Sequence, residues 1–292
     1  MTYVKRLQEA ARAAIPALKK MGVDDKYTAF KSTLDIPTRF YPPSQSDSKF
    51  QAEQALGDWA ENSVKAAINR AKVGVRAVHY GDNSKAFAED EGFREAYIAG
   101  VTRTFAEGKR SDLLLLRDDV VAPDDCTALG DAETKRIVKD SIGGLEVRSS
   151  RLSVQIYKDY QQRRLEDGHK PTSLEPNITV KVEDLFKVYV WNVRNKKPQA
   201  YVQVFFDEVH GLSFLDILEY IGTAKLRVEK HKRSDKTTIM VPISQGKLIG
   251  KVTQPKFHVV HNITQNGRHD IFAKPEGGKI EIDADAVRKL LE

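Results

Sequence analysis

The residues best suited to chemistry in this sequence are Glu146 and Arg148, which lie two positions apart in the segment GGLEVRSS (residues 143–150). This segment is predicted to be a strand, and alternate side chains of a strand point to opposite faces, so the carboxylate and the cation share one face. Asp112 begins a short apolar run, residues 112–116, which is predicted to be a neighbouring strand buried on both faces. Charges on buried strands are costly unless they pair or bind a ligand. Two carboxylates plus substrate oxygens form a ligand set that Mg²⁺ accepts.

A structural ion pair is the alternative explanation, because Glu146 could simply neutralise Arg148 without any function. The order of the segments favours a functional site. The stretch KRSDLLLL, followed by GGLEVRSS, resembles the signature of PD-(D/E)XK nucleases, in which an acidic residue opens one strand and acid-x-lysine follows on the next. Further on, the blocks SVQIYKDYQQ, VKVEDLFKVYVWNV and AYVQVFFDEVHGLSFLDIL resemble restriction endonucleases of the AccI group. The similarity spans residues 57–220 and implies a type II restriction endonuclease that cuts double-stranded DNA with Mg²⁺ and leaves 5′-phosphate ends.

The resemblance implies a role for each matching residue. Asp112 and Glu146 would hold the metal, and the nucleophile would be a water whose pKa the cation lowers. Arg148 stands where the wider class has lysine; because arginine stays protonated, it would orient this water and stabilise charge in the transition state rather than act as a base. The pentapeptide GDWAE resembles the helical element from which many such nucleases supply a glutamate, which makes Glu61 a further catalytic residue. The alternatives are that Glu61 is a helix-surface charge or that Glu53 takes its place.

Two other groups of residues imitate a nuclease site. A literal P-D…E-x-K occurs within residues 123–135, but this segment is polar and is predicted to be an exposed loop, where no buried strand would fix the carboxylates. His261, Asn262 and His269 suggest a histidine-based nuclease, yet they flank an Asn-Gly pair at residues 266–267, which indicates a hairpin turn. We therefore expect these histidines to be structural or to contact DNA.

Periodicity along the chain predicts the elements that position the site. Apolar residues at helical spacing predict amphipathic helices near residues 2–20 and 52–68. Residues 187–193 and 200–209 are rich in β-branched and aromatic residues, and each is predicted to be a strand. Ser213 and Asp216 have the spacing of a capping box at the start of a helix.

These elements predict an α/β fold: a restriction-endonuclease-like mixed central sheet flanked by helices, with a basic β-rich C-terminal extension. We expect a single nuclease domain over residues 1–292, with a helical N-terminal part (1–100), a catalytic α/β core (101–222) and the basic subdomain (223–292). Strands and a short terminal helix at residues 285–291 are predicted for this last part.

Composition excludes several other classes of protein. The 292 residues are 40% hydrophobic and 30% charged, as in an ordinary globular protein. The single cysteine, Cys126, rules out an intramolecular disulfide and a cysteine-only zinc cluster and suits a reducing compartment. The charged N-terminus does not match a signal peptide, and no apolar run is long enough for a membrane helix. We therefore expect a cytoplasmic prokaryotic protein with no membrane partner.

The positive charge of the chain, +6 at pH 7, is compatible with DNA as the partner. Residues 225–236 concentrate six Lys or Arg against two acidic residues. Residues predicted to contact DNA are Lys230, Lys232, Arg233, Lys109 and Arg110. We expect a homodimer, because a twofold-symmetric duplex site is cut most simply by a twofold-symmetric protein, and a DNA methyltransferase as the functional partner. Alternatives are a non-specific or repair nuclease, a catalytically silent DNA-binding protein, and an interaction protein whose charged strand is only an ion pair.

Overall fold

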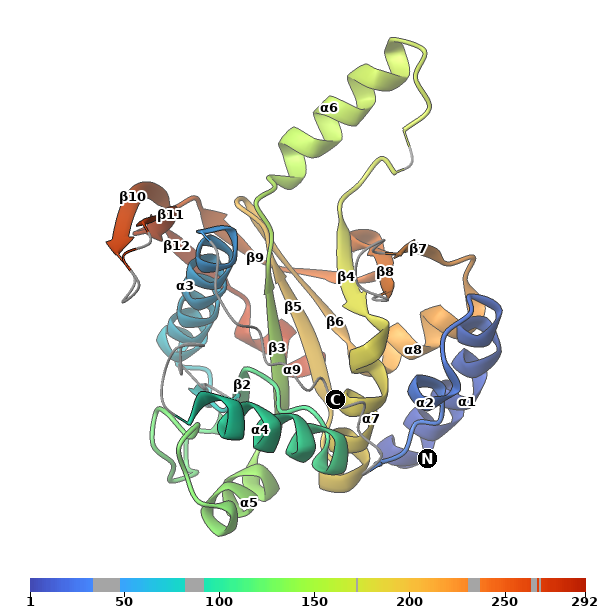
Figure 1. Cartoon of the computed structure of the whole chain (residues 1–292), viewed down its shortest axis with the longest axis vertical. Helices are drawn as coiled ribbons and strands as arrows, with labels where there is room; N and C mark the ends of the chain where they lie inside the picture. Colours follow the sequence, from blue (N-terminus) through green and yellow to red (C-terminus); the bar gives the residue numbers. More distant parts are fainter. Residues whose placement is uncertain (34–47, 82–91, 172, 231–236, 264–266, 268) are drawn as a thin grey trace.

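A computed structural model describes residues 1–33, 48–81, 92–171, 173–230, 237–263, 267 and 269–292. A seven-stranded sheet runs through the centre of the molecule (Figure 1). In spatial order its strands are β1 (Val75–His79), β2 (Leu113–Arg117), β3 (Gly143–Ser149), β5 (Gln199–Val204), β6 (Glu208–Ser213), β9 (Lys247–Thr253) and β12 (Lys279–Ile282).

The sheet is mixed. β3 and β5 pair in parallel, whereas the other neighbouring strands run antiparallel. A parallel pair needs a long crossover connection, and here it consists of α6 (Val154–Glu166), β4 (Asn177–Lys181) and α7 (Val182–Asn195). The predicted α/β class with a mixed central sheet and flanking helices is confirmed.

Helices cover both faces of the central sheet. Side chains of α3 and α9 pack with Leu145 and Val147 of β3 on one face. Side chains of α1, α7 and α8 pack with Tyr201 of β5 on the other face. The helices are α1 (Tyr3–Lys20), α2 (Asp25–Thr28), α3 (Ser48–Ala71), α4 (Phe93–Glu107), α5 (Asp131–Asp140), α8 (Phe214–Thr223) and α9 (Ala284–Lys289), besides α6, α7 and a 3-10 turn, Ile243–Gln245.

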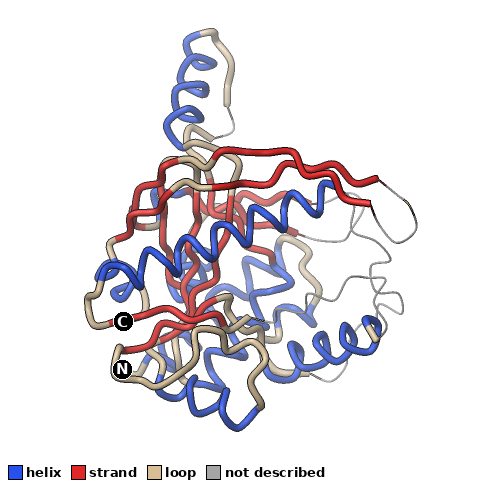
Figure 2. The backbone as a smooth tube through the Cα atoms, turned by 90° about the vertical axis from the view of Figure 1, so that its left-hand side faces the viewer, coloured by secondary structure: helices blue, strands red, loops and turns tan. Residues whose placement is uncertain are grey.

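Two smaller sheets flank this core. β4 pairs with β8 (Thr237–Pro242), which pairs with β7 (Arg227–Lys230). β10 (Lys256–Ile263) and β11 (His269–Glu276) form a two-stranded ribbon that lies along helix α3 (Figure 2). The strands that follow residue 222 are therefore distributed over all three sheets. Helix α6 projects from the top of the molecule as an arm (Figures 1 and 2).

The prediction of a strand at residues 187–193 was wrong, because this segment is the second half of helix α7. Phe186 on one side of α7 belongs to the core around α1 and α8. Trp191 belongs to a separate cluster around Tyr80. A helix buried on two sides has no exposed polar stripe, so its aromatic and β-branched residues imitate a buried strand.

Two other sequence predictions need correction. Residues 200–209 do not form one strand: β5 ends at Val204, the chain turns, and β6 begins at Glu208. The polar loop predicted between β2 and β3 includes the first turns of α5, where Asp131 and Glu133 are favourable at a helix N-terminus.

Other local predictions are confirmed. Helices α1 and α3 cover the segments predicted to be amphipathic helices. The Ser213 side chain caps α8 by accepting a hydrogen bond from the Asp216 amide at 3.0 Å. Strands and a short terminal helix, α9, occur in the C-terminal part of the chain, as predicted. In the described part of the chain, no helix has both the length and the apolar character needed to span a membrane.

Candidate active site

The site lies where β2 and β3 separate. β2 pairs with Gly143–Leu145 of β3, so in the described structure this edge of β3 is open from Glu146 onward. The opposite edge of β3 continues to pair with β5, which places Glu146 opposite Tyr201 and Arg148 opposite Gln203. From Glu146 onward, therefore, β3 is paired with a strand on one edge only.

Asp112, the residue before β2, occupies this gap. Its Oδ2 atom accepts a hydrogen bond from the amide of Val147 at 2.7 Å, in place of a strand partner. Its carbonyl accepts a hydrogen bond from the amide of Tyr80 at 2.9 Å, which fixes the backbone. Burial, followed by the nearby carboxylates of Glu146 and Glu61, raises the pKa of Asp112 well above its ordinary value. A cation bound between these carboxylates would relieve this cost.

Glu146 is the most buried carboxylate of the site, with 2% of its side chain exposed. Its Oε1 atom contacts Lys109 Nζ and lies 2.9 Å from Nη2 of Arg148. Its Oε2 atom is buried and has no hydrogen-bond partner among the described residues. One oxygen is thus held by two cations while the other remains available for a ligand.

A fourth carboxylate, Asp184 in the first turn of α7, lies behind these cations. Its Oδ2 atom is 3.4 Å from Lys109 Nζ and 3.6 Å from Arg148 Nη2, and its Oδ1 atom is 3.6 Å from Lys187 Nζ. Burial alone would raise the pKa of Asp184, but these three cations outweigh it, so the pKa is lowered. Asp184 therefore stays ionised and holds the cations in place.

Lys109 and Arg148 both keep their protons. Burial alone would lower the pKa of each, but the carboxylates around them, Glu146 first, outweigh this effect and raise both pKa values. A cation with a raised pKa cannot accept a proton near neutral pH. The two side chains can donate hydrogen bonds and stabilise negative charge.

Glu61 of α3 interacts electrostatically with the same group. Burial, then the charges of Asp58 and Glu146, raise the pKa of Glu61 from 4.5 to about 7. Arg148 and Lys109 oppose this shift. A carboxyl group that titrates near neutrality beside two metal-ligand candidates is typical of a functional site.

The donor set fits a hard cation. Glu146 offers its unpaired Oε2, and Asp112 offers the oxygen that does not bind Val147. Among the described residues, no group of three or more His, Cys, Asp or Glu side chains is placed to hold a metal. The chain would therefore supply two carboxylates, and water and substrate phosphate would complete the shell, as is usual for Mg²⁺.

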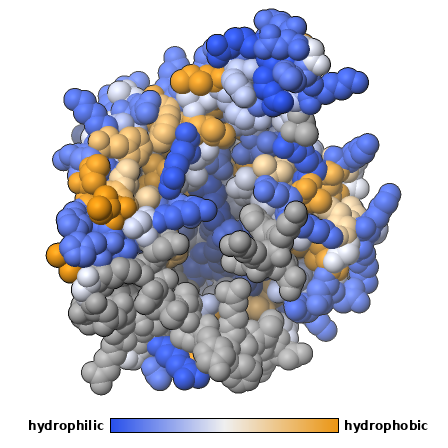
Figure 3. Space-filling model, turned by 45° about the horizontal axis from the view of Figure 1, so that its top comes forward, coloured by the Kyte–Doolittle hydropathy of each residue, from blue (hydrophilic) through white to orange (hydrophobic). Residues whose placement is uncertain are grey.

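A cavity of about 620 Å³ adjoins this group of residues. Lys109, Arg110 and Lys187 line it together with Asp112 and Asp184. The cations give it a positive lining on which phosphate can approach Asp112. The molecule is also hollowed on the side seen in Figure 3, where the surface of the hollow is hydrophilic.

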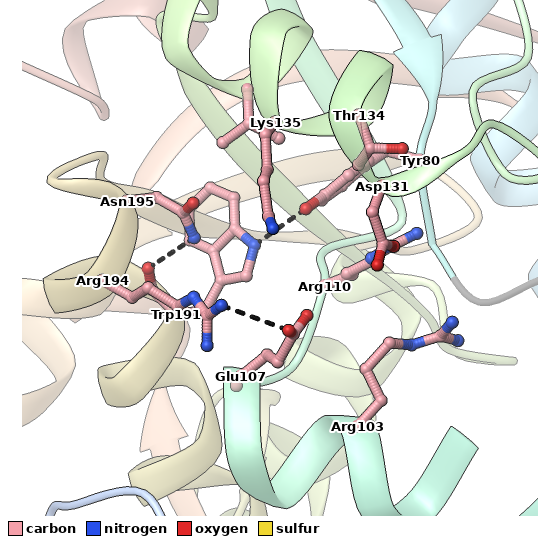
Figure 4. Close-up of a pocket in the computed structure, with 12 residues that line it drawn as sticks. Tyr80, Arg103, Glu107, Arg110, Asp131, Thr134, Lys135, Trp191, Arg194 and Asn195 are labelled. Carbon is pink, nitrogen blue, oxygen red and sulfur yellow. Dashed lines mark hydrogen bonds and ion pairs between the residues drawn. The ribbon is translucent and has the colours of Figure 1, made fainter. Parts of the chain in front are cut away.

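The literal P-D…E-x-K residues lie elsewhere. Asp124 is 79% exposed and pairs with Arg76 at 3.6 Å. Glu133 is half exposed, 4.0 Å from Arg136. Lys135, in α5, lines a small pocket in which the Trp191 indole donates to the Tyr80 hydroxyl at 3.0 Å and Arg194 pairs with Glu107 at 3.1 Å (Figure 4). These residues are dispersed over a solvated surface.

The predicted DNA contacts divide into three groups. Lys109 lies inside the carboxylate group, and the Arg110 guanidinium lies 5.2 Å from the ring centre of Tyr80 in the cavity wall. Lys230 is exposed at the end of β7. Lys232 and Arg233 lie outside the described residues, so their contact with DNA stays a prediction.

The histidines noted in the sequence form a pair on the ribbon. His261 Nε2 and His269 Nδ1 lie 2.7 Å apart across β10 and β11 and share one hydrogen bond. This pair is exposed. Residue 266 of the predicted Asn-Gly turn lies outside the described residues, and Gly267 has the positive φ of 73° that suits glycine in a turn.

Sequence reasoning missed Asp184, Lys187 and Tyr201. Asp184 and Lys187 lie three residues apart on α7, a spacing that indicates a shared helix face, but the segment that contains Lys187 was predicted to be a strand. The hydroxyl of Tyr201 is fully buried beneath Arg148, whose guanidinium lies 6.0 Å from the ring centre. The alternation of the strand at residue 201 could have placed it opposite Glu146, had the parallel pairing of β3 and β5 been known.

Comparison with known protein families gives a match over the whole chain. The model of the AccI restriction endonuclease family matches residues 1–176 and 172–292. Comparisons with curated proteins and with solved structures give no significant match. The family match confirms the resemblance to restriction endonucleases of the AccI group. The chain therefore belongs to the AccI restriction endonuclease family, whose members are hydrolases that cut DNA at specific sites as type II restriction endonucleases.

Proposed function

We propose that this endonuclease hydrolyses phosphodiester bonds with Mg²⁺ held by Asp112 and Glu146, leaves 5′-phosphate ends, and has a restriction-endonuclease-like core. The observation that carries the proposal is the buried Oε2 atom of Glu146, which has no hydrogen-bond partner among the described residues and belongs to a carboxylate electrostatically coupled to Asp112. Burying such an atom costs free energy unless a ligand binds it.

When bound, Mg²⁺ would polarise the scissile phosphate and lower the pKa of water. The remaining work falls to side chains of the chain. Arg148 and Lys109 would donate hydrogen bonds to the phosphate oxygens and stabilise the charge that develops there. Asp184 keeps these two cations in position.

Proton transfer needs a different group, because both cations keep their protons. Burial and the nearby carboxylates raise the pKa of Glu61 to about 7, so this carboxylate is suited to exchange a proton with water near neutral pH. The interpretation of Glu61 as a catalytic residue thus gains support over the alternative of a plain helix-surface charge.

DNA would approach through the positively lined cavity beside Asp112. We also propose that two copies act together, each cutting one strand of a twofold-symmetric site. A methyltransferase that modifies the same sequence would protect the host genome. Lys230, Lys232 and Arg233 would add phosphate contacts outside the site.

The test combines metal dependence with the chemistry of the products. Purified protein is incubated with phage-sized DNA and Mg²⁺, with and without excess EDTA, and the fragments are then treated with DNA ligase. We expect discrete fragments only when Mg²⁺ is free, and ligation without prior phosphorylation. Cleavage that persists in EDTA would exclude the metal, and fragments that need a kinase before ligation would exclude 5′-phosphate ends.

A further inference from the structure

The exposed hydrophobic residues are concentrated in two places away from the active site. Of the fifteen large hydrophobic side chains that are exposed in the described structure, eight belong to the β10–β11 ribbon or to the α6 arm and its base. These are Phe257, Val259, Ile263 and Ile271 on the ribbon, and Leu152, Ile156, Tyr160 and Leu165 on the arm. Concentrated apolar surface of this kind marks an interaction site, whereas scattered single residues do not.

The ribbon has two different faces. Asp270, on the inward face, is buried against α3 and accepts a hydrogen bond from Gln51 Nε2 at 2.8 Å. The outward face alternates with it and consists of Phe257, Val259, His261 and Ile263 on β10, opposite Pro275, Ala273, Ile271 and His269 on β11. Pro275 is buried, and the other seven residues are exposed. None of these eight outward residues is Lys, Arg, Asp or Glu. The ribbon is therefore anchored to α3 by its inward face, and its outward face carries no Lys, Arg, Asp or Glu.

The ribbon and the base of the arm are connected through the β5–β6 turn. The ring of Phe206 in this turn packs edge-on against Phe257, with 5.7 Å between centroids, and the Phe206 amide donates to the carbonyl of Leu152 at 2.9 Å. The next residue, Asp207, accepts three hydrogen bonds of 2.7 to 2.9 Å from the first residues of the arm. Figure 3 shows hydrophobic surface on this side of the molecule, from the base of the arm outward.

We propose that the outward face of the β10–β11 ribbon, continued by the base of α6, is the surface through which two copies of this chain associate. This inference rests on the proposed action of two copies and names their interface. The charges favour a second copy over DNA, because phosphate binding relies on Lys and Arg side chains and the outward face of the ribbon has neither. Each chain carries a net charge of +6, so two copies repel each other, and contact through a face without Lys or Arg avoids adding local repulsion to this. Homodimer interfaces are also more apolar than ordinary protein surface.

The test measures association without any need for cleavage. Sedimentation over a range of concentrations compares the wild type with Val259→Asp/Ile271→Asp, which changes two outward positions that are 73% and 58% exposed. The control is Val121→Asp/Leu248→Asp, which places the same charges at positions that are 81% and 55% exposed and lie outside the ribbon and the arm. We expect a dimer for the wild type and the control, and a dissociation constant at least ~100-fold higher for the ribbon variant.

Other outcomes would overturn the proposal. A ribbon variant that dimerises like the wild type would place the interface elsewhere, and a wild type that stays monomeric with and without its DNA would exclude self-association. A variant whose dimer is intact but whose DNA binding is lost would make this face a DNA contact. If the aspartate pair does not fold, Val259→Thr/Ile271→Thr replaces it, with a smaller increase expected. Sequence-specific cleavage by the wild type is measured separately, so failure of the nuclease proposal can be distinguished from failure of the interface proposal.

Discussion

Two regions of this molecule carry the same residue types in very different surroundings. The segment with Asp124, Glu133 and Lys135 spells the nuclease motif literally, whereas the site of Asp112 and Glu146 departs from it by placing arginine where lysine is usual. Asp124 is mostly exposed, while Glu146 is almost completely buried. Water solvates the first set of carboxylates. In the second set, burial and the nearby carboxylates raise the pKa of Asp112, and the buried Oε2 atom of Glu146 has no hydrogen-bond partner among the described residues. Burial and electrostatic repulsion between carboxylates therefore identify the candidate site better than a literal match to the motif does.

The largest difference between the two regions is expected from removing one carboxylate charge in each. Glu146→Gln should reduce cleavage by more than the ~10²–10³-fold typical of losing one charge stabiliser, because an amide is a poor ligand for Mg²⁺. Binding of the specific DNA should stay measurable, since the cations remain. Glu133→Gln, the matched change in the literal motif, should cut at nearly the wild-type rate. The cleavage rates are measured on plasmid DNA. Equal rates for the two variants would show that Glu146 is no more important for cleavage than Glu133.

The next effect concerns Arg148, which stands where the wider PD-(D/E)XK class has lysine. Arg148→Ala should lower the cleavage rate by ~10²–10³-fold, whereas Arg148→Lys should keep a substantial part of the rate, because lysine restores a cation. The free energy of unfolding should fall by less than the ~3–5 kcal/mol of breaking an isolated buried pair, since Lys109 still contacts Glu146. Single-turnover rates and urea unfolding measure the two effects. Unchanged cleavage in a folded alanine variant would remove Arg148 from the mechanism.

A smaller effect is expected in how the stability of the protein depends on pH. The pKa of Glu61 is raised from 4.5 to about 7 in the folded chain, so folding is favoured while Glu61 is protonated, and this contribution is lost as the pH rises through about 7. Glu61→Gln should abolish this part of the pH dependence. The measurement is thermal unfolding between pH 5 and pH 8 without divalent metal, with Glu53→Gln on the same helix as the control. If stability depends on pH identically in the wild type and in Glu61→Gln, the pKa of Glu61 is not raised as described.

The smallest effect is expected in the loop motif. Glu133→Ala combined with Lys135→Ala should leave cleavage within a few fold of the wild type and the unfolding free energy within about 0.5 kcal/mol, as for most surface substitutions. A double variant that folds but does not cut DNA would move the active site to this segment.

The carboxylates of the site were predictable because the relevant rule is local. Strand alternation places Glu146 and Arg148 on one face whatever the rest of the fold, and Asp112 directly precedes an apolar run. Lys109 was predicted to bind DNA, but its contact with Glu146 depends on how β2 and β3 separate, which is a tertiary feature. Asp184 was missed because the following segment, residues 187–193, was predicted to be a strand, so its helical spacing with Lys187 was not used. α7 is buried on two sides, and its aromatic and β-branched residues resemble those of a strand.

The strands of the central sheet were also only partly predictable from the sequence. The runs that form β2 and β3 were recognised, and so was the capped helix α8. The hairpin of β5 and β6 was predicted as one strand because its turn, from Phe205 to Asp207, begins with two aromatic residues that imitate a strand. A turn without glycine or proline gives little local signal.

The central claim is that Asp112 and Glu146 hold the divalent cation, and metal placement tests it most directly. Crystals of the protein with its DNA and Mn²⁺ in place of Mg²⁺ would give an anomalous difference map that locates the metal without any assumption about mechanism. We expect the peak within bonding distance of Oε2 of Glu146 and of a carboxylate oxygen of Asp112. A peak at Asp124 or Glu133, or DNA bound at the site with no peak beside Glu146, would contradict the claim.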